Sequence, residues 1–179
     1  MKLLPIEPNI RLLVYAPHPG NTHFSANIIK SMVIQQLSEE ECKSILADAS
    51  FGQLGCSADD QPYVIPIYFA YEAEHLYVFS TPGQKIEWMR KNPKVCVQVT
   101  KIENEIAWVS VIVIGSYQEL REPQYTDERT HARKLLEKHV HWWQTALAER
   151  QSKSEDELIQ PLLFRIHVNT LTGLRAGDK

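Results

Sequence analysis

The sequence has few cysteines and no long apolar run. No stretch approaches the ~20 apolar residues that a transmembrane helix requires, and a single lysine before a short leucine pair is too weak a start for a signal peptide. The three cysteines, Cys42, Cys56 and Cys96, are far apart and form no C-x-x-C pair and no Cys/His zinc spacing. We therefore expect reduced cysteines in a cytoplasmic protein that has no membrane partner.

An excess of positive charge is also missing. The chain has 19 Lys and Arg residues against 22 Asp and Glu residues, which gives a net charge of −3. The cationic residues are scattered along the sequence and do not form a basic segment. Proteins that bind nucleic acid need a basic face, so we expect no nucleic-acid partner.

The common catalytic motifs are absent as well. The sequence contains no G-x-G-x-x-G, P-loop, G-x-S-x-G or H-E-x-x-H motif, which excludes the usual dinucleotide, nucleotide-hydrolysis, α/β-hydrolase and zincin sites. Ser80 or Ser110 could pair with a histidine, but no spacing selects a partner, so the catalytic residues stay unassigned. His139 and His141 would point to different sides of a helix, and we expect no metal site.

The central feature that is present is an alternating strand from Tyr63 to Tyr71. Every other residue in it is large and apolar, and many are β-branched or aromatic. Pro66 interrupts this strand. Since proline lacks an N–H group, its neighbours keep backbone groups that a ligand could use. The segment Leu76 to Phe79 predicts a second strand, most simply the hairpin partner of the first.

The turn after this second strand gathers groups that could bind an anion. Two hydroxyls, an amide and an ammonium group lie where an amphipathic helix begins: Ser80, Thr81, Gln84 and Lys85. A helix N-terminus favours negative charge, because its first N–H groups have no partner and the macrodipole is positive there. The turn therefore predicts a phosphate site. The alternative is an ordinary helix start with Ser or Thr as the cap and a solvated Lys85.

The remaining pattern predicts a single domain of short antiparallel strands, with residues 1–31 as an extension and 32–179 as the domain. A capping box at Ser38 and Glu41 begins the first helix. In the long strand 106–120, Gly115 would allow a bend, and Trp108, Ser110, Ile112 and Ile114 share one face. The other expected elements are strands at 51–57, 95–99 and 162–168, and a helix at 126–150.

The order of these pieces resembles a known family. LSEEECKSIL is followed by QPYVIPIYFAY, then by a G-x-K-x-x-x-M-x-x-N-P-x-V run, W-x-S-V-I-x-x-G and a late FRIHVNTLTGLRA. The chain is similar over roughly residues 33–176 to the pyridoxamine 5′-phosphate oxidase-related, flavin-binding split-barrel proteins, most of all to the nitroimidazole-reductase-like branch. The resemblance implies a mainly β fold with helices, a six-stranded antiparallel split β-barrel, and a homodimer with FMN at its interface.

The resemblance also implies roles for individual residues. The residues implied to line the flavin and its ribityl chain are Val64, Ile65, Pro66, Ile67, Tyr68 and Phe69. Those implied to meet the phosphate are Ser80, Thr81, Gln84 and Lys85. Trp108 and Ser110 would approach the flavin across the dimer, and Arg175 from the C-terminal end.

The resemblance implies an FMN-dependent oxidoreductase that acts on a small-molecule substrate or electron donor. Relatives in the nitroimidazole-reductase-like branch often carry a histidine at the end of the second hairpin strand, where this chain has Phe79-Ser80. That departure argues against a histidine-dependent reductase. The alternative is a flavin- or haem-binding module without turnover, for storage or sensing. Pyridoxamine phosphate oxidation would need a second cationic cluster, which the sequence does not show.

Overall fold

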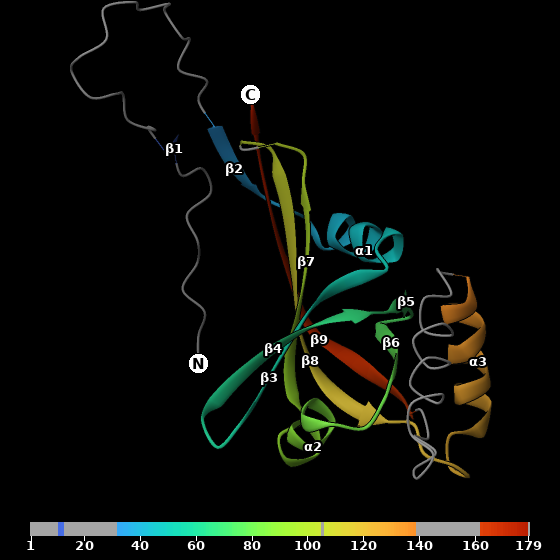
Figure 1. The fold of residues 1–179 in the computed structure, drawn as a ribbon. Helices are drawn as coiled ribbons and strands as arrows, with labels where there is room; N and C mark the ends of the chain where they lie inside the picture. The colour runs from blue at the N-terminus through green and yellow to red at the C-terminus, as the bar shows by residue number, and fades with distance from the viewer. Residues whose placement is uncertain (1–10, 13–31, 105, 139–161, 179) are drawn as a thin grey trace, which may run out of the picture.

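A computed structural model describes residues 11–12, 32–104, 106–138 and 162–178. In these ranges the chain forms an antiparallel sheet that curves into a barrel, with three helices packed around it (Figure 1). Of the expected extension 1–31, only Arg11–Leu12 is described, as a short strand, and the rest lies outside the described residues. The second half of the expected helix 126–150 lies outside them as well.

The elements in chain order are β1 (Arg11–Leu12), β2 (Met32–Gln36), α1 (Glu39–Asp48), β3 (Phe51–Ala58), β4 (Gln61–Tyr68), β5 (Ala70–Glu72), β6 (His75–Ser80), α2 (Gln84–Lys91), β7 (Lys94–Ile102), β8 (Trp108–Glu119), α3 (Thr126–Glu137) and β9 (Leu162–Asp178). None of the helices in the described ranges is both long and apolar enough to cross a bilayer.

The strand pairings confirm the predicted split barrel. The main path runs β1-β2-β9-β8-β7-β3-β4, and β6 pairs with both β5 and β9, always antiparallel. Because β5 follows β4 after one residue, these two segments act as one interrupted strand. The circuit of β3, β4 with β5, β6, β9, β8 and β7 therefore has the six strands expected, and β1 and β2 are added at the edge of β9.

Two expected elements differ from the structure. The strand 63–71 is broken at Phe69, whose N–H donates to the Ser50 carbonyl at 3.0 Å and whose side chain is fully buried. As a result β4 pairs with β3, and only β5 forms the hairpin with β6. The last strand was expected to end at Val168 but continues to Asp178, because β8 and β2 offer it partners along its whole length.

The pairing of β8 and β9 is irregular at the predicted glycine. Gly115 is opposite Val168 while Ile114 is opposite Thr170, so Asn169 is an extra residue in β9. A Cβ atom at Gly115 would lie 2.5 Å from the carbonyl oxygen of His167. Only glycine fits this close approach of the two backbones.

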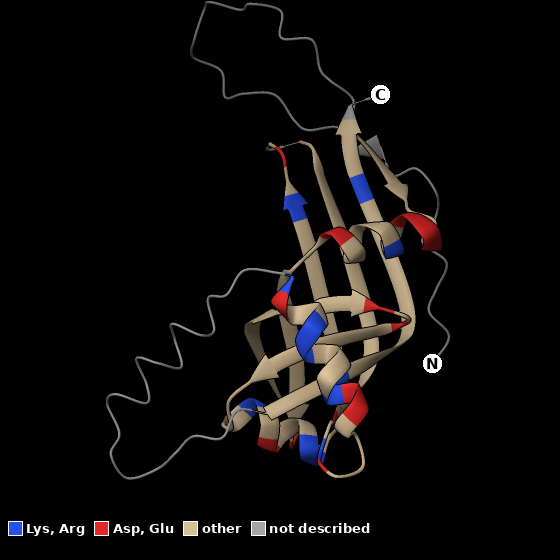
Figure 2. Cartoon of the chain, turned by 90° about the vertical axis from the view of Figure 1, so that its right-hand side faces the viewer, with Lys and Arg blue, Asp and Glu red and all other residues tan. Residues whose placement is uncertain are grey.

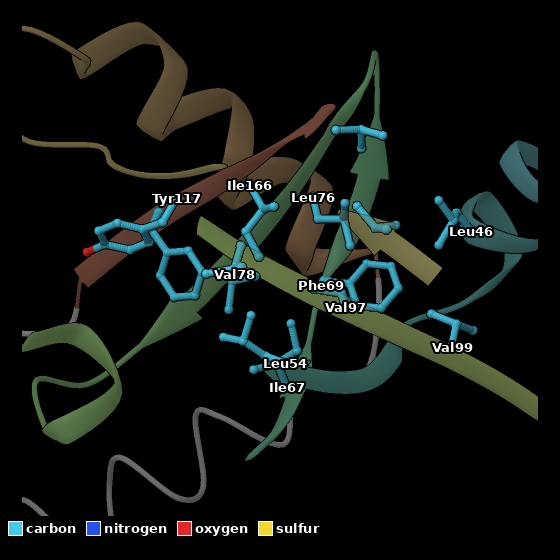
Figure 3. Packing of buried hydrophobic residues seen from close by; sticks show 14 of the residues in the cluster. Leu46, Leu54, Ile67, Phe69, Leu76, Val78, Val97, Val99, Tyr117 and Ile166 are labelled. Atoms are coloured by element: carbon cyan, nitrogen blue, oxygen red, sulfur yellow. The ribbon is translucent and has the colours of Figure 1, made fainter. Parts of the chain in front are cut away.

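The barrel interior holds the main hydrophobic core. Figure 3 shows side chains from several strands meeting there, among them Leu54, Phe69, Val78, Val97 and Ile166. The α1 helix begins at the expected capping box, with the Glu41 N–H donating to Ser38 Oγ at 3.2 Å. The α3 helix packs on the outside of the barrel through a second cluster that includes Tyr77, Leu135, Leu136 and Leu163.

Candidate functional site

One face of strands β3, β4, β7 and β8 carries apolar side chains that are exposed to solvent. The exposed fraction is 65% for Val64, 46% for Ile114, 43% for Phe51, 40% for Ile112 and 37% for Tyr68. We call this surface the outer face; its other members include Gln53, Pro66, Cys96, Gln98, Ile102, Trp108 and Ser110. Figure 2 shows charged residues mainly on helices, loops and strand ends, so the strand centres are mostly uncharged. Such a surface is typical of a binding site or an interface.

Strand register makes the outer face continuous. Pro66 is opposite Gln53, Gln53 is opposite Gln98, and Gln98 is opposite Ile112, so one row of side chains crosses from β4 to β8. Directly opposed residues of an antiparallel pair point to the same side of the sheet. The structure thus brings together on one face two segments that are distant in sequence, the Pro66 strand and the Trp108 strand.

Trp108 and Ser110 lie near one end of this face. Trp108 is half-buried and opposite the exposed Ile102. The Ser110 hydroxyl accepts a hydrogen bond from Gln98 Nε2 at 3.1 Å. This bond holds the hydroxyl on the outer face, where it can also donate to a ligand.

The run from Val64 to Phe69 divides between two environments. Val64, Pro66 and Tyr68 point to the outer face, as alternation along a strand requires. Ile67 and Phe69 are 5% and 0% exposed and belong to the barrel core, where the half-buried Ile65 also packs. Only the main chain of these three residues could meet a ligand on the outer face.

Pro66 occupies a strand at the end of the main sheet path. Among the described residues, β3 is the strand that pairs with β4, and β4 has no strand partner on its other side. A proline is tolerated there because its missing N–H costs little at an edge. Main-chain groups along that edge of β4 lie outside the sheet ladder.

The α2 helix begins with an N-terminus that no side chain caps. Gly83 is the N-cap residue, with φ at 153°, and it makes no side-chain capping bond. The alternative with Ser or Thr as the cap is therefore wrong: the buried Ser80 hydroxyl instead donates to the Thr81 carbonyl at 3.2 Å. The Ile86 and Glu87 N–H groups donate to the Gly83 carbonyl at 2.9 and 3.2 Å. The positive end of the α2 dipole at this turn is an environment that favours an anion.

Packing of α2 against β3 and β4 positions this turn. Ile86 and Met89 are fully buried, and the Trp88 ring lies 5.5 Å from the Tyr63 ring. Lys85 is half-buried in the first turn of α2. Burial is the largest cause that raises the pKa of Cys56 in β3, the charge of Cys96 raises it further, and the positive charge of Lys85 lowers it.

Arg175 is not brought to the outer face. It is opposite Val109 in β8, so it points to the other side of the sheet from Ser110. Its Nη1 donates to Glu41 Oε1 of α1 at 3.1 Å. Phe79, at the position where some relatives have histidine, packs against the cluster beneath α3.

Sequence analysis missed several members of the outer face, among them Phe51 and Gln98. Phe51 is opposite Tyr68 with their rings 5.0 Å apart, and Gln98 holds Ser110. Alternation in strands 51–58 and 94–102 separates the two faces of each strand. It does not show which face lies outside, because that depends on how the strands pair.

Comparisons with known proteins agree with this architecture. Residues 38–175 match the family profile of pyridoxamine 5′-phosphate oxidase. An uncharacterised protein of Rhizobium meliloti (strain 1021) is 39% identical over 146 residues, which cover 81% of this chain and 97% of the relative.

Solved structures share the fold. The crystal structure of an FAD-binding protein from Mesorhizobium loti is 39% identical, covers 82% of this chain and 99% of its own, and superposes with a TM-score of 0.67. A proposed 5-nitroimidazole antibiotic resistance protein from Bacteroides thetaiotaomicron is 20% identical, covers 92% of this chain and 100% of its own, and has a TM-score of 0.57. At that identity the second likeness concerns the fold alone.

Proposed function

The chain belongs to the pyridoxamine 5′-phosphate oxidase family, and on this premise we propose that it binds a flavin and uses it as an oxidoreductase. The observation that carries the proposal is the 39% identity, across 82% of this chain, with the FAD-binding protein of Mesorhizobium loti. The uncapped turn of α2 and the apolar outer face support it independently of that likeness.

The residues at the α2 turn fit a flavin phosphate. The N-cap residue Gly83 makes no side-chain capping bond, and a Cβ there would meet nothing within 4 Å, so the turn has room for a ligand. Ser80, Thr81, Gln84 and Lys85 would hold the phosphate by hydrogen bonds and charge. Hydrogen bonds between an ammonium group and a phosphate are among the stronger ones in proteins.

The flavin ring would lie against the outer face. Val64, Pro66 and Tyr68 would contact it with their side chains, and Ile65, Ile67 and Phe69 only through the main chain. Arg175 is not part of this proposal, because it lies on the other side of the sheet and is paired with Glu41.

A second copy of the chain would complete the site. Six large apolar side chains on the outer face, Ile102 included, are between 37% and 76% exposed, which is unfavourable for a monomer in water. We propose that the outer faces of two copies pack together, and that Trp108 and Ser110 of one copy approach the flavin of the other.

A bound flavin would supply two-electron transfer, and the residues of this chain would position it and exclude water. Two tyrosine hydroxyls, those of Tyr68 and Tyr77, are the candidates for donating a proton to a substrate. Tyr77 is unsuitable, because its hydroxyl donates to Glu128 at 3.3 Å beneath α3. Tyr68 lies on the outer face and is the better candidate.

The flavin is proposed to be FMN, since the anion-binding groups of the described residues gather at one turn and suit a single terminal phosphate. FAD is the alternative that the Mesorhizobium loti protein favours. Chromatography of the flavin released on denaturation distinguishes the two. We also propose a cytoplasmic location, which the unpaired cysteines and the exposed Cys96 support.

The deciding experiment is the absorption spectrum of the purified protein, followed by an NADH and NADPH oxidation assay in air. Flavin absorbance with turnover is the expected result. Flavin absorbance without turnover would favour a non-catalytic binding module, and a Soret band would favour haem. A colourless protein that takes up neither FMN nor FAD would overturn the proposal.

A further inference from the structure

Two histidines that are distant in sequence face each other across a strand pair. His75 of β6 is directly opposite His167 of β9, and their ring centroids are 5.1 Å apart. The pair lies on the side of β6 and β9 that also carries Tyr77 and Arg165, near α3 and away from the outer face. The proposed flavin site does not use it.

The backbone pattern brings the two side chains close. The Val168 N–H donates to the Glu74 carbonyl at 2.9 Å, which makes Glu74 and Val168 a hydrogen-bonded pair. Since the two pair types alternate along an antiparallel ladder, the adjacent His75 and His167 form a non-hydrogen-bonded pair. In such a pair the Cα atoms are only about 4.5 Å apart, so the side chains are neighbours.

The separation of the rings suits a shared metal ion. With an N–metal distance of about 2.1 Å and tetrahedral angles, two imidazoles on one ion have ring centroids about 5 Å apart. The observed 5.1 Å agrees with this geometry. The planes of the two rings are inclined at 44°, so the rings do not stack on each other.

A backbone hydrogen bond orients the His75 ring. Its Nδ1 lies 2.8 Å from the Ala73 carbonyl oxygen, and because a carbonyl only accepts, Nδ1 carries the proton. The other nitrogen, Nε2, then has the lone pair that a metal needs. Metal-binding histidines usually have such a partner at the second nitrogen, which fixes the tautomer. Burial is the main cause that lowers the pKa of His75, and it favours the neutral ring.

The neighbouring carboxylates are already engaged. Glu72 is opposite His75 on β5, but it bonds His131 Nε2 of α3 at 2.5 Å. Glu128 bonds Arg165 and Tyr77. In the described ranges no three His, Cys, Asp or Glu side chains are arranged to hold a metal ion. Water would therefore supply the remaining ligands.

We propose that His75 and His167 form a two-histidine site for a divalent transition-metal ion. Imidazole suits Ni²⁺, Cu²⁺ and Zn²⁺, with Cu²⁺ the tightest by the general affinity order. The site would join β6 to β9 by a reversible cross-link two residues before the extra residue of β9, Asn169. Ions that prefer oxygen ligands, such as Mg²⁺ and Ca²⁺, would not bind there.

The test is a calorimetric titration of the tag-free full chain with Ni²⁺, compared with His75→Gln, His167→Gln and the double variant. The parent should bind one equivalent of Ni²⁺ that the double variant does not bind. Each single variant should raise the dissociation constant of that equivalent by about tenfold or more. His131→Gln is the matched control: it removes an exposed histidine of α3 that is paired with Glu72, and the equivalent should remain.

A second readout is the melting temperature. An ion that binds only the folded chain stabilises it, so Ni²⁺ should raise the melting temperature of the parent and of His131→Gln. It should not raise the melting temperature of the other variants. His167 is exposed, so its Gln variant should fold even if His75→Gln does not. If His167→Gln binds Ni²⁺ as the parent does, or if the parent and the double variant bind equally, the proposal is wrong.

Discussion

Arg90 of α2 donates two hydrogen bonds to Glu119 at the end of β8, one from Nε and one from Nη2, each at 2.8 Å. Arg121 also donates to Glu119, at 2.9 Å, and so does the Tyr117 hydroxyl, at 3.2 Å. The hydrogen bonds and charges of Arg90, and then of Arg121, lower the pKa of Glu119 from its usual 4.5 to about 2. The carboxylate therefore ties the helix that carries the candidate phosphate turn to the longest strand pair of the barrel.

Replacing Glu119 with Gln should destabilise the protein. The side chain is only 14% exposed, and loss of its charged hydrogen bonds should lower the free energy of unfolding at pH 7 by about 1.5–3 kcal/mol. Urea denaturation measures the change. Glu122→Gln is the control: Glu122 is 64% exposed and pairs with Arg129, so its loss should cost much less.

This difference should depend on pH in one direction. Because the folded-state pKa of Glu119 is depressed, its stabilisation is complete above pH 4.5 and disappears as the pH falls toward 2. The gap in unfolding free energy between the parent and Glu119→Gln should therefore narrow over that range. If the difference in unfolding free energy stays constant from pH 6 down to about pH 2, the pKa of Glu119 is not lowered.

Gly115→Ala should destabilise the barrel at the β8–β9 irregularity. The new methyl group would lie 2.5 Å from the His167 carbonyl oxygen and 2.6 Å from Ile166 Cγ2. Because a backbone atom cannot yield easily, we expect a loss of about 1–3 kcal/mol in urea denaturation. Gly177→Ala in the paired strand β9 meets nothing within 4 Å and should be nearly neutral. Equal stability of the two variants would contradict the close approach.

Lys85→Ala should weaken flavin binding if Lys85 meets the phosphate. Loss of a charge-assisted hydrogen bond of about 1.5–3 kcal/mol raises the dissociation constant about 10- to 150-fold. Fluorescence titration with FMN at ~0.15 M salt measures it, since salt then screens distant charges. Lys91→Ala and Lys94→Ala are the controls, because both lysines are exposed and lie at or beyond the end of α2. If Lys85→Ala loses no more affinity for FMN than the two control variants, Lys85 does not bind the phosphate.

Ile112→Lys should dissociate the proposed dimer. The substitution places an unpaired charge on the β8 part of the outer face, where packing with a second copy would bury it. Light scattering at micromolar concentration should give twice the chain mass of 20.6 kDa for the parent and the single chain mass for the variant. Ser44→Lys, on the exposed side of α1, adds the same charge elsewhere and should stay dimeric. A monomeric parent would refute the dimer.

Local patterns in the sequence were enough to predict the barrel class and much of its detail. Alternation predicted a strand at 95–99, which lies within the observed β7. The Ser38 capping box predicted the start of α1, and Gly115 predicted the place of the irregularity between β8 and β9. Strand alternation also predicted that Trp108 and Ser110 share one face with Ile112 and Ile114. Each of these features depends on residues that are close in sequence, so their local conformational preferences are visible without knowledge of the tertiary packing.

Tertiary structure alone decided which residues meet. Phe69 entered the core and broke the expected strand, because a fully buried aromatic ring outweighs the continuity of a ladder. Arg175 turned to α1 and Glu41 because the register of β9 against β8 fixes the direction of every side chain along it. His75 and His167 became neighbours for the same reason. The register of these strands depends on packing between distant segments, and the spacing of residues along the chain does not show which of them will be opposite each other.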